Sequence, residues 1–322
     1  MKSILLIIPY YGKWPIWFDA YLLSVAANPT VHWLCPTDCE IPENYPSNIT
    51  FLPITLSQLN NHVNEVVEAE VPLNHRKFCD LKPAYAEIFS EQLQGYDFWG
   101  ICDVDIIWGD IRKFISEEIL NEYDIISSRK EEISGHFNLF RNTQQINSLY
   151  RKLPSYKSLY AVPKIKRVDE LVLSNYIKND TFFKGLDLKV FWSKILCNQE
   201  NGRDSHQEYY LDKWLWNDGK MLELKNGKPV NEVMYLHFIN WKRTMKYSEI
   251  KYEDNPTQFY ISYIGLHYKL HSEIQKIFRR IKNIYNGYYV REYRRLKKMK
   301  FKSIVKRVIR RLKKIYCFYL PK

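Results

Sequence analysis

The chain lacks the glycine-rich patterns that cradle phosphates in the commonest nucleotide-binding folds. No Gly-x-Gly-x-x-Gly and no Gly-x-x-x-x-Gly-Lys-Ser/Thr occurs among its 322 residues, so neither a dinucleotide fingerprint nor a P-loop is present. The first apolar segment, Lys2 to Tyr11, ends in Pro9-Tyr10-Tyr11 without a glycine-rich turn. This ending also argues against a sugar nucleotidyltransferase.

Paired cysteines and long apolar runs are missing as well. The sequence holds no Cys-x-x-Cys, and His32, Cys35 and Cys39 have no second cluster at zinc spacing, so we expect ordinary buried thiols. No run approaches the roughly 20 apolar residues of a membrane span, and Met1 to Pro9 is too short for a signal peptide. We therefore expect a cytoplasmic protein with reduced cysteines. The six cysteines are Cys35, Cys39, Cys79, Cys102, Cys197 and Cys317.

Positive charge is concentrated at one end of the chain. Residues 265–322 hold 19 Lys or Arg and two acids, a net charge of +17, whereas the whole chain carries +12 and the rest therefore −5. From Lys297 the apolar residues recur at helical spacing opposite a basic face, which suits an anionic membrane surface. Packing on the body as a solvated helix and binding of a polyanion are the alternatives. The aromatic residues Tyr316, Phe318 and Tyr319 favour the membrane.

The remaining pattern alternates strands with helices and predicts an α/β fold whose sheet is mainly parallel. Ligands of such sheets bind at the carboxyl ends of strands, where Tyr10, Tyr11, Asp103 and Asp105 fall. Strands are expected at Lys2–Tyr11, Thr30–Leu34, Ile49–Leu52, Phe98–Ile101, Tyr123–Ser128, Phe137–Arg141 and Met234–Phe238. Helices are expected at Trp14–Ala27, Leu81–Leu93, Asn142–Leu153, Asp169–Lys178 and Ser205–Trp216, the last with a capping-box pattern.

An acidic motif, Asp103-Val104-Asp105, follows the apolar run that begins at Tyr96. Residues two apart on a strand share a face, and two adjacent carboxylates repel unless a cation lies between them. Mg²⁺ and Mn²⁺ favour such oxygen ligands and commonly bridge substrate phosphates. The motif predicts a metal that holds the diphosphate of a nucleotide-activated substrate.

In this setting the motif resembles the Asp-x-Asp of metal-dependent glycosyltransferases with the GT-A fold. The resemblance covers roughly Lys2 to Met245 and implies a GT-A-like (Rossmann-like) mixed, mainly parallel sheet flanked by helices. We expect a glycosyltransferase domain at residues 1–265 and a basic amphipathic helical tail at 266–322. The resemblance also implies Mn²⁺ or Mg²⁺ as cofactor and a nucleotide sugar, UDP-linked in similar enzymes, as donor.

The segment His75 to Pro83 resembles the stretch that contacts the donor sugar and diphosphate. Lys77 and Lys82 would then neutralise phosphate, and Asp80 would accept hydrogen bonds from sugar hydroxyls; a helix N-cap at Asp80 with solvated lysines is the alternative. Tyr10 and Tyr11 are further donor candidates, because aromatic rings stack on sugars and bases.

Two later segments complete the resemblance. Ser134 to Phe140 is similar to the small-residue strand below the acceptor, where Gly135 allows close approach and His136 contacts the sugar or lies in an ordinary loop. Leu236 to Lys242 resembles the late segment of glycogenin-like and lipopolysaccharide glucosyl- and galactosyltransferases. There His237 would be the third metal ligand, or else a core histidine. Lys242 would contact the diphosphate and Trp241 the acceptor.

His206-Gln207-Glu208 resembles the Asp-Gln-Asp motif near the reacting anomeric carbon in those enzymes, with a histidine in place of the first acid. Glu208 or Asp204 is a candidate general base for inversion, whereas Gln207 beside the sugar favours retention.

The expected activity is hexosyl transfer, with retention favoured. The acceptor is expected to be a lipid-linked glycan in bacterial capsule, O-antigen or lipopolysaccharide synthesis, at the inner face of the cell membrane. A catalytically silent α/β protein that binds membranes or polyanions is the alternative, and nucleic acid is not an expected partner because no such motif accompanies the charge.

Overall fold

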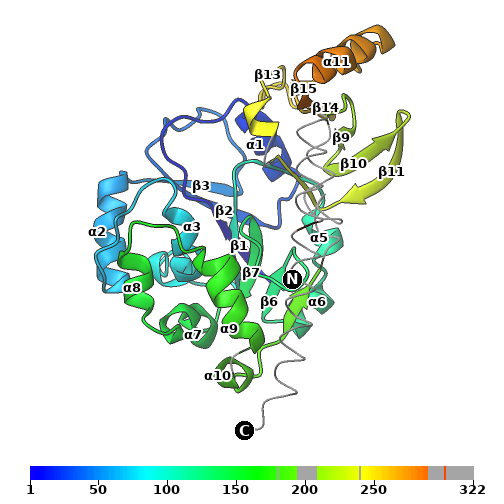
Figure 1. Cartoon of the computed structure of the whole chain (residues 1–322). Helices are drawn as coiled ribbons and strands as arrows, with labels where there is room; N and C mark the ends of the chain where they lie inside the picture. Colours follow the sequence, from blue (N-terminus) through cyan, green and yellow to red (C-terminus); the bar gives the residue numbers. More distant parts are fainter. Residues whose placement is uncertain (180, 194–208, 239–240, 289–300, 302–322) are drawn as a thin grey trace.

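The computed structural model describes residues 1–179, 181–193, 209–238, 241–288 and 301. Its centre is a seven-stranded sheet in the order β3-β2-β1-β4-β7-β6-β8, flanked by helices on both faces (Figure 1). The first four strands in space are parallel, and β7 runs antiparallel to β4. The strands are β1 Ile4–Ile7, β2 His32–Thr37, β3 Ile49–Pro53, β4 Phe98–Cys102, β6 Ile125–Ser127, β7 Phe137–Arg141 and β8 Val190–Trp192.

The sheet is buried on both faces, which explains its nearly continuous apolar strands. In β1, Ile4 and Leu6 join one core cluster, while Leu5 and Ile7 join the cluster on the opposite face. A Cβ on Gly100 of β4 would lie 2.5 Å from the carbonyl oxygen of Asn138. This position in the central strand therefore has room only for glycine. The expected mixed α/β architecture is confirmed.

Several expected helices are shorter or interrupted. Pro83 lies in a 3₁₀ turn that divides the expected helix Leu81–Leu93 into short pieces, because proline lacks the N–H for a continuous helix. The helices that flank the sheet are α1 Phe18–Ala26, α2 Leu56–Val67, α3 Phe78–Leu81, α4 Tyr85–Ile88, α5 Ile111–Phe114, α6 Glu117–Glu122, α7 Gln144–Asn147, α8 Tyr156–Ala161, a π-helix η3 Val168–Leu173, α9 Ser174–Asn179 and α10 Thr181–Lys184.

A second sheet, which the sequence pattern did not predict, occupies the C-terminal part. Its order is β11-β10-β9-β14-β15-β13, and its neighbours are antiparallel except β13 and β15. Trp214 lies in β9, so the helix expected at Ser205–Trp216 is wrong there; residues 205–208 lie outside the described residues. The strands are β9 Trp214–Asn217, β10 Lys220–Lys225, β11 Lys228–Val233, β13 Tyr247–Ser248, β14 Gln258–Ser262 and β15 Gly265–His267.

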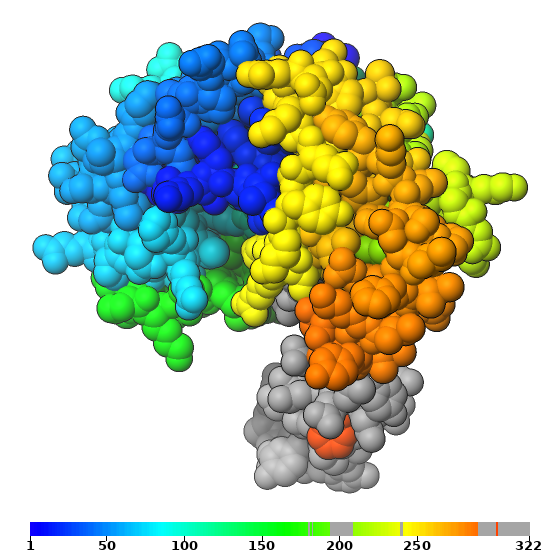
Figure 2. All heavy atoms as spheres, turned by 90° about the horizontal axis from the view of Figure 1, so that it is seen from above, coloured from blue at the N-terminus to red at the C-terminus, as the bar shows by residue number. Residues whose placement is uncertain are grey.

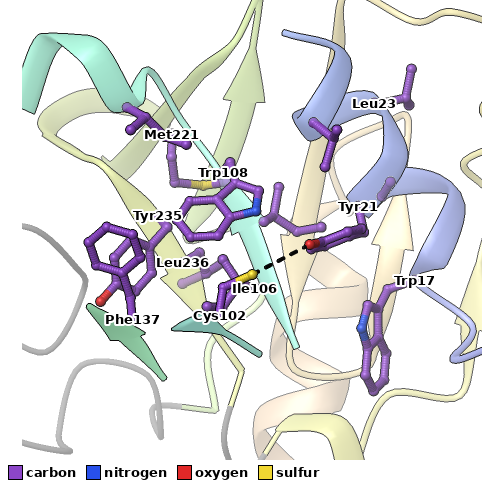
Figure 3. Close-up of a cluster of buried hydrophobic side chains, with 14 of the residues drawn as sticks. Trp17, Tyr21, Leu23, Cys102, Ile106, Trp108, Phe137, Met221, Tyr235 and Leu236 are labelled. Atoms are coloured by element: carbon purple, nitrogen blue, oxygen red, sulfur yellow. Dashed lines mark hydrogen bonds between the residues drawn. The ribbon is translucent and has the colours of Figure 1, made fainter. Parts of the chain in front are cut away.

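A two-stranded ladder connects the two sheets. It pairs β5 Ile106–Trp108 with β12 Tyr235–His237, and β12 confirms the strand expected at Met234–Phe238. Figure 3 shows the Trp108 ring among Met221 of β10, Tyr235 and Phe137, with the Tyr21 hydroxyl 3.9 Å from the sulfur of Cys102. This core holds the end of β4, the ladder and the second sheet together.

The chain continues in the second sheet to His267, two residues beyond the expected end of the first domain, and then forms helix α11, Glu273–Tyr285. In Figure 1 this helix lies at the outer end of the second sheet, near β13 and β15. From Lys297 onward the structure describes Phe301 alone. The amphipathic helix predicted for this segment therefore lies outside the described residues. Among described residues, no helix combines the length and apolar character needed to cross a membrane.

Candidate functional site

A cleft of about 620 Å³ opens at the carboxyl edge of β1 and β4. Tyr10 and Tyr11, which follow β1, line it together with Asp103 and Asp105, which follow β4. The expectation that these four residues meet at one edge is therefore confirmed. Figure 2 shows a hollow where the blue N-terminal residues lie beside the yellow residues near position 250.

Asp103, Asp105 and His237 bring one donor atom each to within 4.8 Å of one another. Asp103 lies after β4, Asp105 directly before β5, and His237 at the end of β12. The ladder sets this proximity, because His237 pairs with Ile106 and the N–H of Phe238 donates to the Asp105 carbonyl oxygen at 2.9 Å. Two carboxylate oxygens and one imidazole nitrogen are thus presented to one point.

Asp105 is the electrostatic centre of this cluster. One of its oxygens accepts a hydrogen bond from the Lys242 ammonium at 2.7 Å, and the other lies 3.5 Å from Nε2 of His237. Burial by itself raises the pKa of a carboxyl, but His237 and Lys242 outweigh it and hold the pKa of Asp105 well below its usual range. Asp105 is therefore an anion at physiological pH.

Asp103 pairs with the second lysine of the site. The Lys82 ammonium, which is buried, donates to Asp103 at 2.7 Å and also to the carbonyl oxygen of Gly135. Burial tends to lower the pKa of Lys82, but the charge of Asp103 outweighs it and raises the pKa. Lys82 is thus a permanent cation on the wall of the cleft, and the idea of a solvated lysine at this position is wrong.

His136 backs the cluster rather than facing the cleft. It is buried, its ring stacks on that of His237 at 4.2 Å, and Nδ1 lies 3.0 Å from the Ser134 hydroxyl. A Cβ on Gly135 would lie 2.4 Å from Oε1 of Glu170. The group that approaches the Gly135 backbone closely is therefore the Glu170 side chain. Neither Gly135 nor His136 lines the cleft, so the acceptor contacts predicted for them are wrong. His136 instead packs behind His237 and supports its ring.

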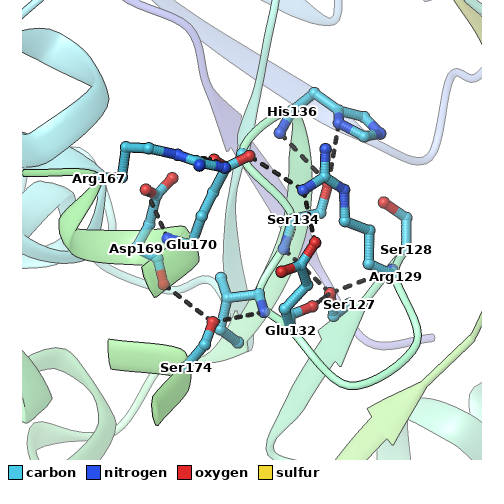
Figure 4. Close-up of polar contacts among 12 residues, drawn as sticks. Ser127, Ser128, Arg129, Glu132, Ser134, His136, Arg167, Asp169, Glu170 and Ser174 are labelled. Carbon is cyan, nitrogen blue, oxygen red and sulfur yellow. Dashed lines mark hydrogen bonds and ion pairs between the residues drawn. The ribbon is translucent and has the colours of Figure 1, made fainter. Parts of the chain in front are cut away.

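A network of charged groups surrounds this support (Figure 4). Arg129 donates to Glu132 at 2.9 Å and to Glu170 at 3.2 Å, and Arg167 pairs with the same Glu170. The N–H of Ser134 donates to Oδ1 of Asn138 at 3.0 Å. The loop before β7 is therefore held both by local polar contacts and by Glu170, which lies 41 positions after Arg129.

Lys77 and Asp80 form a buried pair away from the cleft. Both are fully buried, with Lys77 Nζ 2.9 Å from Oδ2 of Asp80. Asp80 also accepts hydrogen bonds from the N–H groups of Lys166 and Val168, and Lys77 donates to the carbonyl oxygen of Leu159. Neither residue lines the cleft, so the contacts predicted between them and the nucleotide sugar are wrong. The pair instead anchors the segment that follows α8. The alternative N-cap at Asp80 is also wrong, because α3 begins two residues earlier.

Trp241 is fully buried in the core. The prediction that it contacts an acceptor is therefore wrong, whereas Lys242, its neighbour, is half exposed and lines the cleft. The candidate catalytic residues Asp204, Gln207 and Glu208 lie outside the described residues.

The two tyrosines at the end of β1 differ in their surroundings. Tyr10 is half-buried, stacks on Trp14 with ring centroids 5.2 Å apart, and donates to the carbonyl oxygen of Lys13. Tyr11 is buried against Phe78, and its hydroxyl has no hydrogen-bond partner among the described residues. A buried hydroxyl of this kind is costly unless something bonds to it. Tyr11 therefore adds an unsatisfied buried hydroxyl to the residues that line the cleft.

The cleft also contains side chains that the sequence did not single out. Cys79, expected to be buried, is exposed and lines the cleft with Tyr85 and Trp17. Cys79 and Tyr85 lie on either side of Pro83, just before and within the segment predicted as one continuous helix. The spacing of apolar residues there did not indicate which side chains face the cleft. Cys35, Cys39 and Cys102 are buried as expected.

Asp169 lies in the π-helix η3, and its buried carboxyl should make the stability of the folded protein depend on pH. Burial raises the pKa of its carboxyl to about 7, against the opposing charge of Lys82. An exposed aspartate titrates near about 3.9, so between these values the folded state binds more protons than the unfolded state. The free energy of unfolding should fall as pH rises from about 4 to about 7, by up to about 1.4 kcal/mol per pH unit, and then level off.

Asp169→Asn removes this titration and keeps an oxygen to accept the 2.7 Å hydrogen bond from the Glu170 N–H. In urea unfolding between pH 5 and 8, the stability of the variant relative to wild type should rise up to pH 7. Asp187→Asn, at an exposed position, is the control and should give a constant difference. A constant difference for Asp169→Asn would contradict the raised pKa.

Comparisons with known proteins place this geometry in context. No curated protein matches the chain. One similar solved structure is the apo-form glycosyltransferase GlyE of Streptococcus pneumoniae TIGR4, at 12% identity and a TM-score of 0.36. That match covers 62% of this chain and 47% of the other, and so weak a similarity carries no argument about function. A family of unknown function, DUF6625, matches residues 6–270, and the chain belongs to this family.

Proposed function

We propose that the chain is a metal-dependent glycosyltransferase that uses a nucleotide sugar, with UDP as the expected nucleotide. The observation that carries the proposal is the convergence of Asp103, Asp105 and His237 within 4.8 Å, with both aspartates on the wall of a cleft. A volume of about 620 Å³ is in the range of small-molecule sites. The acceptor in this proposal is a lipid-linked glycan of bacterial capsule, O-antigen or lipopolysaccharide synthesis.

The donor set fits Mn²⁺ or Mg²⁺. Two carboxylate oxygens suit either ion, and an added imidazole favours the softer Mn²⁺. When bound, such an ion supplies positive charge that stabilises the developing charge on a leaving nucleoside diphosphate. Asp103, Asp105 and His237 are the residues that would hold it.

The lysines give the site a property that can be tested. Lys82 pairs with Asp103 and Lys242 with Asp105, so two cations already balance two anions. A divalent ion alone therefore meets little net negative charge, whereas a diphosphate brings that charge with it. We expect metal and nucleotide to bind together, with both lysines near the phosphates and Tyr10 and Tyr11 lining the same cleft.

Isothermal titration of the full chain tests the proposal. UDP with Mn²⁺ should bind at least about 100-fold more tightly than either ligand alone. Hydrolysis of UDP-glucose or UDP-galactose should also require the metal. The absence of any coupling between UDP and Mn²⁺ would contradict the proposed site, while coupled binding without turnover of any nucleotide sugar would favour a catalytically silent protein.

The stereochemistry of transfer depends on residues outside the described part of the chain. Gln207 beside the sugar would favour retention, and Glu208 or Asp204 as general base would favour inversion. These roles rest on the resemblance of His206-Gln207-Glu208 described above.

We also propose that the protein works in the cytoplasm at the inner face of the cell membrane. Helix α11 supports this, because six large apolar side chains on it are 57–90% exposed: Ile274, Ile277, Phe278, Ile281, Ile284 and Tyr285. Their spacing places them on one side of the helix. The same helix carries four cations, Lys276, Arg279, Arg280 and Lys282, and one acid, Glu273, as suits an anionic lipid surface. The basic segment from Lys297 would extend this attachment.

A further inference from the structure

A second group of metal-type ligands lies in the C-terminal part of the chain. Asp212, His267 and His271 each bring one donor atom to within 4.8 Å of the others. Asp212 lies shortly before β9, His267 ends β15, and His271 directly precedes Ser272, the N-cap of α11. The three residues therefore meet where α11 joins the second sheet, apart from the Asp103–Asp105 cluster.

The hydrogen bonds of His267 fix which of its nitrogens is available. Its Nδ1 lies 2.8 Å from the carbonyl oxygen of Lys269, and a carbonyl can only accept, so Nδ1 carries the proton. In the neutral ring Nε2 then carries the lone pair, which accepts from the Ser262 hydroxyl at 2.9 Å. Nε2 also lies 3.5 Å from Oδ1 of Asp212, and an ion bound between these two atoms would replace the Ser262 hydrogen bond. A ring held through Nδ1–H to a carbonyl is the usual arrangement of a metal-bound histidine.

Asp212 is oriented in the same way. Its Oδ2 accepts the backbone N–H of His271 at 2.9 Å and lies 3.5 Å from the Lys276 ammonium. The other oxygen, Oδ1, points toward both histidines and is 2.7 Å from Nδ1 of His271. One oxygen is thus anchored by the protein while the other is presented to the two imidazoles. Asp212 and His267 are buried, and His271 is partly exposed, which leaves a route for an ion.

We propose that Asp212, His267 and His271 form a zinc site that joins α11 to the second sheet. Two imidazoles and one carboxylate favour Zn²⁺ over Mg²⁺ or Ca²⁺, and three protein ligands leave one position of a tetrahedral ion for water. The ligand composition differs from that of the Asp103–Asp105–His237 site, which has two carboxylates and one imidazole. The ion would link residues 59 positions apart in the sequence and so tie the start of α11 to the second sheet, with water in its fourth position. This inference does not depend on the proposed transferase activity.

Zinc binding by the full chain tests the site. A background variant, Asp103→Asn with Asp105→Asn, removes the carboxylates of the first cluster. Titration of this metal-stripped protein with Zn²⁺ should give one ion per chain, and zinc at about 100-fold above its Kd should raise the Tm by several degrees. Co²⁺, used as a visible probe, should give the absorption bands of a four-coordinate site.

His271→Gln on that background should weaken zinc binding by about 100-fold or more and abolish the Co²⁺ bands. Because His271 is partly exposed, the variant should fold; Asp212→Asn, which retains an oxygen for the His271 N–H, provides a second test. His32→Gln, at an exposed histidine elsewhere, is the control and should bind zinc as the background does. Failure of the background to bind zinc, or equal binding by folded His271→Gln, would overturn the proposal.

Discussion

Asp105→Asn is expected to abolish the coupled binding of Mn²⁺ and UDP, with a loss of affinity of 100-fold or more, about 3 kcal/mol. The change removes one negative charge at the point where two carboxylates and His237 converge. It also leaves the Lys242 ammonium, 2.7 Å away in the wild type, without its counter-charge. The variant would thus lose the negative charge on which the proposed joint binding of metal and diphosphate depends.

Isothermal titration of the variant with UDP and Mn²⁺ measures this loss, and the Tm verifies folding. Asp103→Asn should give a similar loss. Asp187→Asn, an exposed aspartate outside the cleft, should leave the affinity unchanged. A folded Asp105→Asn protein with wild-type affinity would disprove the metal site, whereas a loss confined to Asp105→Asn would restrict the ligand set to one carboxylate.

Phe278→Ser together with Ile281→Ser should release the protein from anionic vesicles. Both side chains are largely exposed on α11, so the fold should not change. Loss of about 1 kcal/mol from each apolar contact with the membrane predicts a decrease in partitioning of about 30-fold. Wild-type binding should also weaken between 0.1 and 0.5 M salt, because screening reduces the attraction of the α11 cations to anionic lipid.

Co-sedimentation with vesicles of phosphatidylglycerol and phosphatidylcholine provides the measurement, and pure phosphatidylcholine shows the part that does not depend on charge. Ile165→Ser with Leu171→Ser removes two exposed apolar residues outside α11 and should bind as the wild type does. Equal sedimentation of the α11 variant and the wild type would rule out α11 as the membrane contact.

The central strands could be predicted from the sequence because burial on both faces leaves long apolar runs. Phe98–Ile101 and Phe137–Arg141 appear in the structure nearly as expected. The acidic motif could be placed for a related reason, since residues that directly follow parallel strands meet at one edge. His237 could be located only through its resemblance to a motif, because its pairing with β5 joins residues about 130 positions apart.

The second sheet was missed although its turns left a sequence signal. Asp218-Gly219 and Asn226-Gly227 both have positive φ angles and connect β9 to β10 and β10 to β11. These dipeptides are typical of two-residue hairpins. In β9 Trp214 and Trp216 are buried and Leu215 and Asn217 are less so, a period of two that the apparent helical spacing of the preceding apolar residues obscured.

Burial of polar residues was the main source of error at the site. Lys77 and Asp80 satisfy one another three positions apart, but their other partners, Leu159, Lys166 and Val168, come from a segment about 80 residues later. No local pattern contains that information. The orientation of Trp241 into the core and Lys242 toward the cleft likewise depends on the tertiary packing.

The ladder between β5 and β12 has a consequence for the order of events during synthesis. β1 to β4 are complete once residue 102 has been made, but the third donor of the Asp103–Asp105–His237 cluster comes 135 residues later. At about 5–20 residues per second, a ribosome needs roughly 7–27 s to cover that interval. A nascent chain therefore presents two neighbouring carboxylates well before the strand that carries the imidazole can pair beside them. Nucleotide affinity should appear late in translation, and ribosome-bound chains that end before β12 should lack it.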